Sequence, residues 1–250
     1  MARAIILAAG MGTRLRPLTD TRPKCLVELA GRPLLDRQLD ALRAAGVEDI
    51  HIVGGYLAEQ LERPGLTRHL NPDYASTNMV HTLFCAEPAL TGDQDLLIAY
   101  GDIVYEPGIV QQMLACDAPL CLAVDLAWRD YWQARMEDPL ADAETLKLTP
   151  EGHVRELGRK PQSYADIEGQ YIGLIKVRAD HVRRLGEIRN AMDREARYDG
   201  KDFANMFMTS FLQHLIDIGI PLRAVPIRNG WLEVDAPEDL EVDVARFYRF

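Results

Sequence analysis

This chain of 250 residues has few cysteines, no long apolar run and no block of basic residues. Its four cysteines form no C-x-x-C pair, so we expect free, reduced thiols at Cys25, Cys85, Cys116 and Cys121. Because no apolar stretch is long enough to span a bilayer or to act as a signal peptide, we expect a cytoplasmic protein without a membrane partner. The net charge of −10, with no Lys/Arg stripe, argues against a nucleic-acid partner.

Two further absences narrow the possible chemistry. The tripeptide Gly-Lys-Ser/Thr does not occur, so the chain has no P-loop. The six histidines are scattered without the spacing of metal ligands, and we assign none of them a catalytic role.

What the sequence does contain is an apolar strand that opens into a basic, glycine-containing loop. Residues 4–9 precede Gly10 and Gly12, and the cations that follow are Arg14, Arg16, Arg22 and Lys24. Glycines let backbone N–H groups approach phosphate oxygens closely, and the cations balance the phosphate charge. The loop therefore predicts a polyphosphate site. A tight turn alone would explain the glycines but not Arg14, Lys24 and the nearby prolines.

This loop is not a dinucleotide-binding fingerprint, because Leu15 stands where a third glycine belongs and Pro17 follows it. Residues 7–19 and 23–26 instead resemble the signature of the nucleotidyltransferases that make nucleoside-diphosphate sugars and CDP-alcohols: Leu-Ala-Ala-Gly-x-Gly-x-Arg-Leu-x-Pro-Leu-Thr, then Pro-Lys-x-Leu. Arg14 would hold the β- and γ-phosphates with its planar fork, and Lys24 would contact phosphate as a mobile cation. The nucleotide-binding residues implied by this resemblance are Leu7, Ala8, Ala9, Gly10, Met11, Gly12, Thr13, Arg14, Lys24, Asn78, Tyr100 and Gly101.

Two aspartates that lie far apart in the sequence are candidate magnesium ligands. Asp102 follows the apolar run 95–100, and Asp235 follows 231–234; both positions resemble metal-binding aspartates of the family. Mg²⁺ prefers oxygen ligands and keeps several waters, so two carboxylates suffice. Taken singly, Asp102 could be turn chemistry and Asp235 a helix N-cap. With the N-terminal signature they predict Mg²⁺ as cofactor, and Lys24, Arg14, Asp102 and Asp235 as the catalytic group.

The segment 71–83 is similar to the bacterial choline-phosphate cytidylyltransferase branch, in which Asn-x-x-x-Ser/Thr-Leu follows an Asn-x-x-Tyr turn. Sugar-phosphate members commonly carry a glycine-rich element there. Asn78 has both a carbonyl and an amide with which it could read the edge of a pyrimidine. It is equally suited to cap the helix expected over 78–90, and both roles can hold at a helix start.

The resemblance to this branch continues in 138–145 and 167–174, where we expect the acceptor to bind. Aromatic faces attract cations, so Trp128, Tyr131, Trp132, Tyr171 and Trp231 could form a wall for a quaternary ammonium or an amine. Asp142, Glu144 or Glu168 could add a counter-charge. Each aromatic residue could equally be core or loop packing. The substrate-binding residues that we single out are Trp128, Asp142, Glu168, Tyr171 and Trp231.

Apolar runs alternate with helical segments, which predicts an α/β fold: a Rossmann-like three-layer sandwich with a mostly parallel mixed sheet. Strands are expected over 3–9, 51–54, 95–100, 120–126, 171–177, 222–226 and 231–234. Helices are expected from Pro33 to Gly46, over 78–90, 109–116, 179–189 and 203–219, and after Pro237. Residues 1–250 are expected to form one domain, with about 127–170 as a small lid or hairpin insertion on the substrate side. Within this insertion, 145–148 and 154–157 are expected to be hairpin-like segments.

These observations predict a Mg²⁺-dependent cytidylyltransferase. It would move CMP from CTP to a small phosphorylated alcohol or phosphonate, with phosphocholine-like acceptors first, and release pyrophosphate. One alternative is a sugar-1-phosphate nucleotidylyltransferase that uses UTP, GTP or dTTP. Another is a non-catalytic nucleotide-sensing homologue, against which the joint presence of Lys24, Asp102 and Asp235 weighs. The oligomeric state is left open, and a homodimer is one option.

Overall fold

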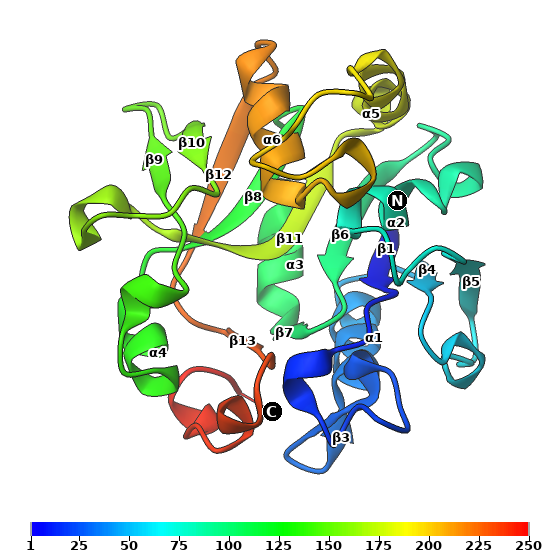
Figure 1. Ribbon diagram of the computed structural model, residues 1–250, viewed down its shortest axis with the longest axis vertical. Coiled ribbons are helices and arrows are strands. Elements are labelled where there is room, and N and C mark those ends of the chain that lie inside the picture. Colours follow the sequence, from blue (N-terminus) through cyan, green and yellow to red (C-terminus); the bar gives the residue numbers. More distant parts are fainter. Residues whose placement is uncertain (1, 250) are drawn as a thin grey trace.

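The computed structural model describes residues 2–249 and has a seven-stranded sheet at its centre (Figure 1). Across the sheet the strands follow the order β12 (Leu222–Ile227), β8 (Leu120–Asp125), β11 (Gln170–Val177), β6 (Asp95–Tyr100), β1 (Ala2–Ala8), β4 (Asp49–Gly54) and β5 (Leu66–Leu70). β11 is antiparallel to β8 and β6, and the remaining neighbours are parallel pairs. The mostly parallel mixed sheet is therefore confirmed.

Helices cover both faces of this sheet and complete the three layers. One face packs against α1 (Leu34–Ala44) and α3 (Pro107–Ala115); the other packs against α2 (Met79–Phe84), α5 (Ala179–Ala191) and α6 (Met208–Asp217). β1, next to the centre of the sheet, shows why both faces are covered, because side chains alternate between faces along a strand. Ala4 and Ile6 lie in the first core, whereas Ile5 and Leu7 lie in the second.

The segment expected as an insertion contains a helix that was not predicted, α4 (Trp128–Arg135), followed by the antiparallel hairpin β9 (Leu146–Leu148) and β10 (Val154–Leu157). The hairpin agrees to within one residue with the hairpin-like segments expected over 145–148 and 154–157. β10 packs against α6 and β12, so the hairpin sits beside the second core. That this segment acts as a lid stays a prediction.

Several predicted elements are wrong in extent. The helix expected over 78–90 ends at Phe84 and is followed by the 3-10 turn η4 (Glu87–Ala89), because Pro88 cannot donate an intrahelical hydrogen bond. The helix expected over 203–219 divides into the 3-10 turn η7 (Phe203–Asn205) and α6, and the helix after Pro237 is a 3-10 turn, η8 (Pro237–Leu240).

Other elements were not predicted at all. The edge strand β5 includes the polar residues Arg68 and His69, so it has no apolar run to mark it. β7 (Ile103–Tyr105) has only three residues and pairs with β13 (Trp231–Glu233), and the short strands β2 (Glu28–Leu29) and β3 (Arg32–Pro33) precede α1.

The cysteine prediction is wrong for two of the four thiols. Cys116 and Cys121 form a disulfide, with 6.8 Å between their Cα atoms, because the short connection from α3 to β8 brings them together. Cys25 and Cys85 are free. Within residues 2–249, no helix has the length and apolar character needed to cross a membrane.

Candidate active site

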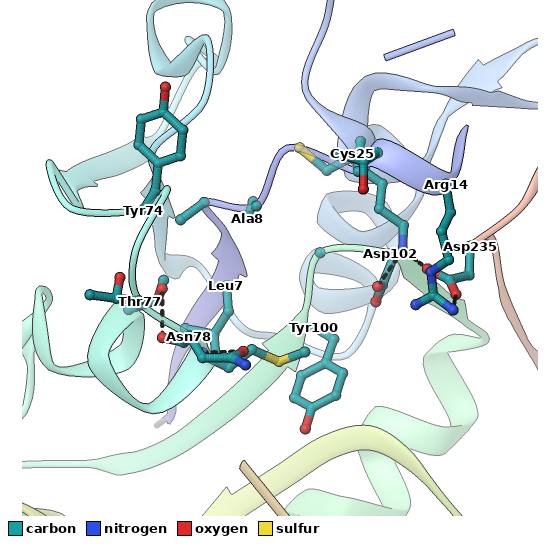
Figure 2. A pocket seen from close by; sticks show the side chains of 18 residues that line it. Leu7, Ala8, Arg14, Cys25, Tyr74, Thr77, Asn78, Tyr100, Asp102 and Asp235 are labelled. Carbon is teal, nitrogen blue, oxygen red and sulfur yellow. Dashed lines mark hydrogen bonds and ion pairs between the residues drawn. The ribbon is translucent and has the colours of Figure 1, made fainter. Parts of the chain in front are cut away.

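The predicted site residues meet at one edge of the central sheet. β1 and β6 are parallel neighbours and therefore end at the same edge, while β4 lies on the other side of β1. From β1 the strand order therefore runs to β4 in one direction and to β6 in the other. Such a switch point is where open α/β sheets bind ligands. A cavity of about 290 Å³ opens at this edge, which we call the nucleotide cavity (Figure 2).

Nearly all of the predicted nucleotide-binding residues line this cavity. Met11 is the exception. The lining residues that were predicted are Leu7, Ala8, Ala9, Gly10, Gly12, Thr13, Arg14, Lys24, Asn78, Tyr100, Gly101, Asp102 and Asp235. Those that were not predicted are Cys25, Tyr74, Thr77, Met79 and Thr82; apart from Cys25, all come from the segment 71–83 whose pattern pointed to nucleotide choice.

Two glycines allow the close backbone packing at this edge. Gly12 has φ of +58°, and a Cβ there would lie 2.9 Å from the Cβ of Lys24. A Cβ at Gly101 would lie 2.7 Å from the carbonyl oxygen of Leu7, to which the Gly101 N–H donates at 2.9 Å. A side chain at Gly12 would displace Lys24, and a side chain at Gly101 would displace β1. The observed packing at this edge therefore requires glycine at both positions.

Lys24 lies between the two predicted metal ligands. Its Nζ donates to Asp102 Oδ2 at 2.8 Å and to Asp235 Oδ1 at 2.5 Å, and Arg14 forms an ion pair with Asp235 Oδ2. Burial favours the neutral amine, but the charges of Asp102, Asp235 and Glu233 outweigh it, so the pKa of Lys24 is raised. Lys24 is therefore a fixed cation in this site.

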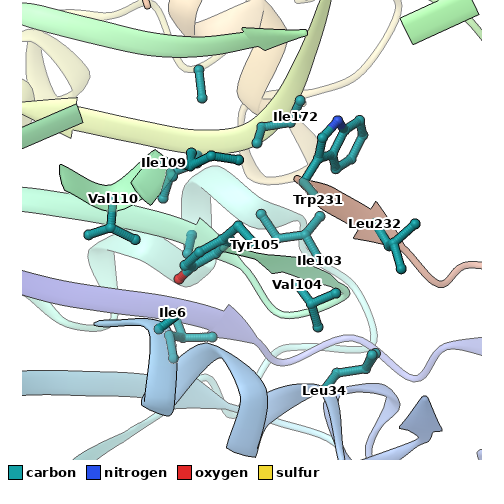
Figure 3. Packing of buried hydrophobic residues seen from close by; sticks show 14 of the residues in the cluster. Ile6, Leu34, Ile103, Val104, Tyr105, Ile109, Val110, Ile172, Trp231 and Leu232 are labelled. Carbon is teal, nitrogen blue, oxygen red and sulfur yellow. The ribbon is translucent and has the colours of Figure 1, made fainter. Parts of the chain in front are cut away.

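The small β7–β13 sheet brings these aspartates together. Tyr105 of β7 and Trp231 and Leu232 of β13 are buried in the core (Figure 3), and the Val234 N–H donates to the Asp102 carbonyl at 2.9 Å. These contacts join the exits of β6 and β13, which are distant in sequence.

The two carboxylates are a suitable donor set for a magnesium ion. Asp102 Oδ1 is buried and has no hydrogen-bond partner, which leaves a negatively charged atom available. Mg²⁺ commonly takes one or two protein carboxylates together with substrate phosphates and waters. Within residues 2–249, no group of three or more His, Cys, Asp or Glu side chains is arranged to hold a metal, so Asp102 and Asp235 would act as a pair.

Asn78 caps α2 and also lines the nucleotide cavity. Its Oδ1 accepts a hydrogen bond from the Met79 N–H at 2.8 Å, and its own N–H donates to the Ala204 carbonyl at 3.1 Å. The helix cap that the sequence suggested is thus present. The cap uses the carbonyl oxygen of the side chain. The side-chain NH₂ group remains available to donate a hydrogen bond to a bound base.

A second cavity of about 190 Å³ adjoins the first and shares Asn78, Met79 and Tyr100 with it. We call it the acceptor cavity. Aromatic and acidic side chains dominate its lining: Trp132, Tyr171, Phe207, Trp231, Asp142, Glu144 and Glu233. Phe207 and Glu233 were not among the expected residues. No local pattern marks Phe207, whereas Glu233 stands two residues before Asp235 and could have been inferred from it.

Two of the predicted substrate-binding residues lie outside both cavities. Trp128 is buried and packs against Trp132 and Tyr164. The Oε2 atom of Glu168 accepts a hydrogen bond from the Leu148 N–H at 2.9 Å. The other three, Asp142, Tyr171 and Trp231, are brought together in the acceptor cavity.

Three carboxyl groups line the acceptor cavity, those of Asp142, Glu144 and Glu233. Desolvation, together with the charges of Asp142, Glu233 and Asp199, raises the pKa of Glu144 to about 7. Desolvation also raises the pKa of Glu233, although Arg135 opposes that shift. Carboxylates with raised pKa values are stabilised by an added cation. The cavity is therefore suited to a positively charged group.

Comparison with known proteins agrees with this geometry. The family model for the MobA-like NTP transferase domain matches residues 4–161. The CTP:phosphoglutamine cytidylyltransferase of Campylobacter jejuni is 43% identical over 97% of this chain and 99% of its own length. The choline-phosphate cytidylyltransferase of Streptococcus pneumoniae is 42% identical over 35% of this chain and 40% of its own.

A solved structure of a cytidylyltransferase has the same fold as this chain. A solved structure of the Streptococcus pneumoniae CTP:phosphocholine cytidylyltransferase superposes with a TM-score of 0.72 and 21% identity, covering 96% of each chain. The N-terminal loop, the switch-point cavity and these matches lead to one conclusion: this chain belongs to the family of NTP transferases with a MobA-like domain.

Proposed function

We propose that this protein transfers CMP from CTP to a small acceptor that carries a phosphate or a phosphonate group, with release of pyrophosphate. One observation carries the proposal. The nucleotide cavity, which holds Lys24 between Asp102 and Asp235, adjoins an aromatic and acidic acceptor cavity and shares Asn78, Met79 and Tyr100 with it. Two substrates could thus meet at one point, and the relatives named above are cytidylyltransferases.

In the proposed reaction an oxygen of the acceptor attacks the α-phosphorus of CTP. A new phosphorus–oxygen bond forms, the bond from the α-phosphorus to the bridging oxygen of the β-phosphate breaks, and pyrophosphate leaves with the electron pair. Arg14 and Lys24 would hold the phosphates and stabilise the charge that develops on them. Asp102 and Asp235 would hold Mg²⁺, which supplies further positive charge beside the triphosphate when bound.

The acceptor would also carry a cationic nitrogen. Three carboxylates and five aromatic rings line the acceptor cavity, and both kinds of group attract cations. Phosphoglutamine and phosphocholine, named in two of the relatives, each contain such a nitrogen. Because CTP is a cytoplasmic metabolite, we also propose a cytoplasmic location for the reaction.

Pyrophosphate release from the purified protein with Mg²⁺ tests this function. CTP, UTP, GTP and dTTP would each be combined with phosphocholine, phosphoethanolamine, phosphoglutamine, 2-aminoethylphosphonate, ethyl phosphate and glucose 1-phosphate. We expect turnover with CTP and at least one nitrogen-containing acceptor, and much less with ethyl phosphate, which lacks the nitrogen. Preference for glucose 1-phosphate with UTP, GTP or dTTP would indicate a sugar nucleotidylyltransferase instead. Binding of CTP without turnover on any acceptor would favour a nucleotide sensor.

A further inference from the structure

A buried ion pair lies next to the backbone of Asp235, and neither of its members lines the nucleotide cavity or the acceptor cavity. Arg135, on α4, donates from Nε to Asp239 Oδ1 at 2.8 Å and from Nη2 to Asp239 Oδ2 at 3.2 Å. The two side chains are 3% and 5% exposed. A bidentate pair of this kind fixes both orientation and distance.

Asp239 uses the same carboxylate to hold the backbone of a predicted metal ligand. Its Oδ2 accepts hydrogen bonds from the Asp235 N–H at 2.7 Å and from the Ala236 N–H at 2.9 Å. The peptide that carries the Asp235 side chain is thereby fixed on one side by Asp239. On the other side, the Val234 N–H holds the chain to the Asp102 carbonyl.

Arg135 also reaches the acceptor cavity through a second carboxylate. Its Nη1 donates to Glu233 Oε2 at 2.8 Å, and Glu233 lines that cavity. Tyr131, one turn earlier on α4, supports the same strand: its hydroxyl donates to the Glu233 carbonyl at 3.1 Å and accepts from the Glu233 N–H at 2.8 Å. One arginine therefore connects a residue of the acceptor cavity with the backbone of Asp235.

We propose that Arg135 and Asp239 are positioning residues that hold Asp235 in place as a metal ligand and tie it to the acceptor cavity through Glu233. This inference rests on the proposed function. Residues that orient metal ligands typically change metal affinity or activity by about 10- to 100-fold when they are replaced. Loss of this pair should therefore weaken metal binding even though neither residue lines the nucleotide cavity.

The test compares two variants with a matched control. Asp239→Asn keeps the shape but removes the charge, and Arg135→Lys keeps the charge but loses the planar fork. The control is Asp95→Asn. Asp95 also pairs with a buried cation, Lys176, at 2.9 Å and accepts from a backbone N–H, that of Ala179, at 2.9 Å, but it stands at the start of β6 and lines neither cavity.

Mn²⁺ binding to each protein in the presence of CTP, without acceptor, would be measured by electron paramagnetic resonance, alongside steady-state kinetics and thermal unfolding. We expect Asp239→Asn and Arg135→Lys to weaken Mn²⁺ binding about 10- to 100-fold, and Arg135→Lys also to raise the KM for the acceptor. Asp95→Asn should lower thermal stability and leave Mn²⁺ binding unchanged.

Folded variants that bind Mn²⁺ as tightly as the wild type, or that are affected no more than Asp95→Asn, would overturn the positioning role. Failure of the proposed function is a separate result. In that case the wild-type protein itself would release no pyrophosphate from CTP with any acceptor, whatever the Mn²⁺ affinities of the variants.

Discussion

Replacing Lys24 by methionine removes the ammonium group that lies between Asp102 and Asp235 while keeping an apolar side chain of similar length. In the wild type this ammonium is 2.8 Å from Asp102 Oδ2 and 2.5 Å from Asp235 Oδ1. After the change, the two carboxylates lose the ammonium group between them. Arg14 still pairs with Asp235. The Arg14 side chain is 68% exposed, so solvent screens its compensation.

The burial of the cluster sets the expected loss of stability. Removing one partner of a fully buried ion pair costs about 3–5 kcal/mol, whereas an exposed pair contributes about 0–1 kcal/mol. The side chains of Lys24, Asp102 and Asp235 are 15%, 17% and 13% exposed, close to the buried limit. We therefore expect a loss of about 2–3 kcal/mol. For a domain of this size that corresponds to a fall in Tm of about 4–12 °C.

The same substitution should make the protein more dependent on magnesium. A bound divalent cation would replace the charge of the missing ammonium, and binding at ten times the dissociation constant stabilises the folded state by about 1.4 kcal/mol. Added Mg²⁺ should therefore raise the Tm of Lys24→Met more than the Tm of the wild type. Lys176→Met is the matched control, because Lys176 is a buried lysine that pairs with Asp95 and lies outside the nucleotide cavity.

Thermal unfolding with and without Mg²⁺ measures the loss of stability and the response to magnesium. Pyrophosphate release measures the effect of the substitution on catalysis. If Lys24 stabilises charge on the reacting phosphates, its loss should lower kcat by about 10²- to 10³-fold and change the KM for CTP much less. A Lys24→Met protein with wild-type Tm, or one that responds to Mg²⁺ no more than Lys176→Met, would refute this account of the cluster. A loss confined to the KM for CTP would show that Lys24 only binds the ground state.

Three further outcomes are expected. Asp102→Ala and Asp235→Ala should each reduce pyrophosphate release to background while thermal unfolding stays cooperative, and near-wild-type rates in either would contradict their assignment as metal ligands. Asn78→Asp keeps an oxygen for the α2 cap but loses the amide NH₂, so the KM for CTP should rise about tenfold at unchanged Tm; an unchanged KM would limit Asn78 to capping. Because the pKa of Glu144 is raised to about 7, its carboxyl group is mostly protonated and neutral below that pH and mostly ionised above it. The KM for an amine acceptor should then fall as pH rises through 7, and Glu144→Gln should raise this KM and flatten the profile; a wild-type profile in Glu144→Gln would exclude Glu144 from acceptor binding.

The sequence by itself determined the parts of this protein that depend on neighbouring residues. The apolar run 4–9 predicted the strand β1, and Gly10, Gly12 and Lys24 predicted a phosphate loop at its exit. The cap at Asn78 was also readable, since a cap depends on the residues of its own first turn. The shorter length of α2 was also readable, because Pro88 lies inside the helix expected over 78–90 and cannot continue it. The edge strand β5 was not readable, because it has no apolar run.

The tertiary structure alone decided which distant side chains meet. Asp102 and Asp235 become neighbours because β7 and β13 pair, and that pairing joins segments with no sequence relation to each other. Glu233 and Phe207 line the acceptor cavity, whereas Trp128 does not, because its ring packs against Trp132 and Tyr164. Contacts of this kind depend on the path of the whole chain, whereas a sequence pattern records only the local preference of each segment.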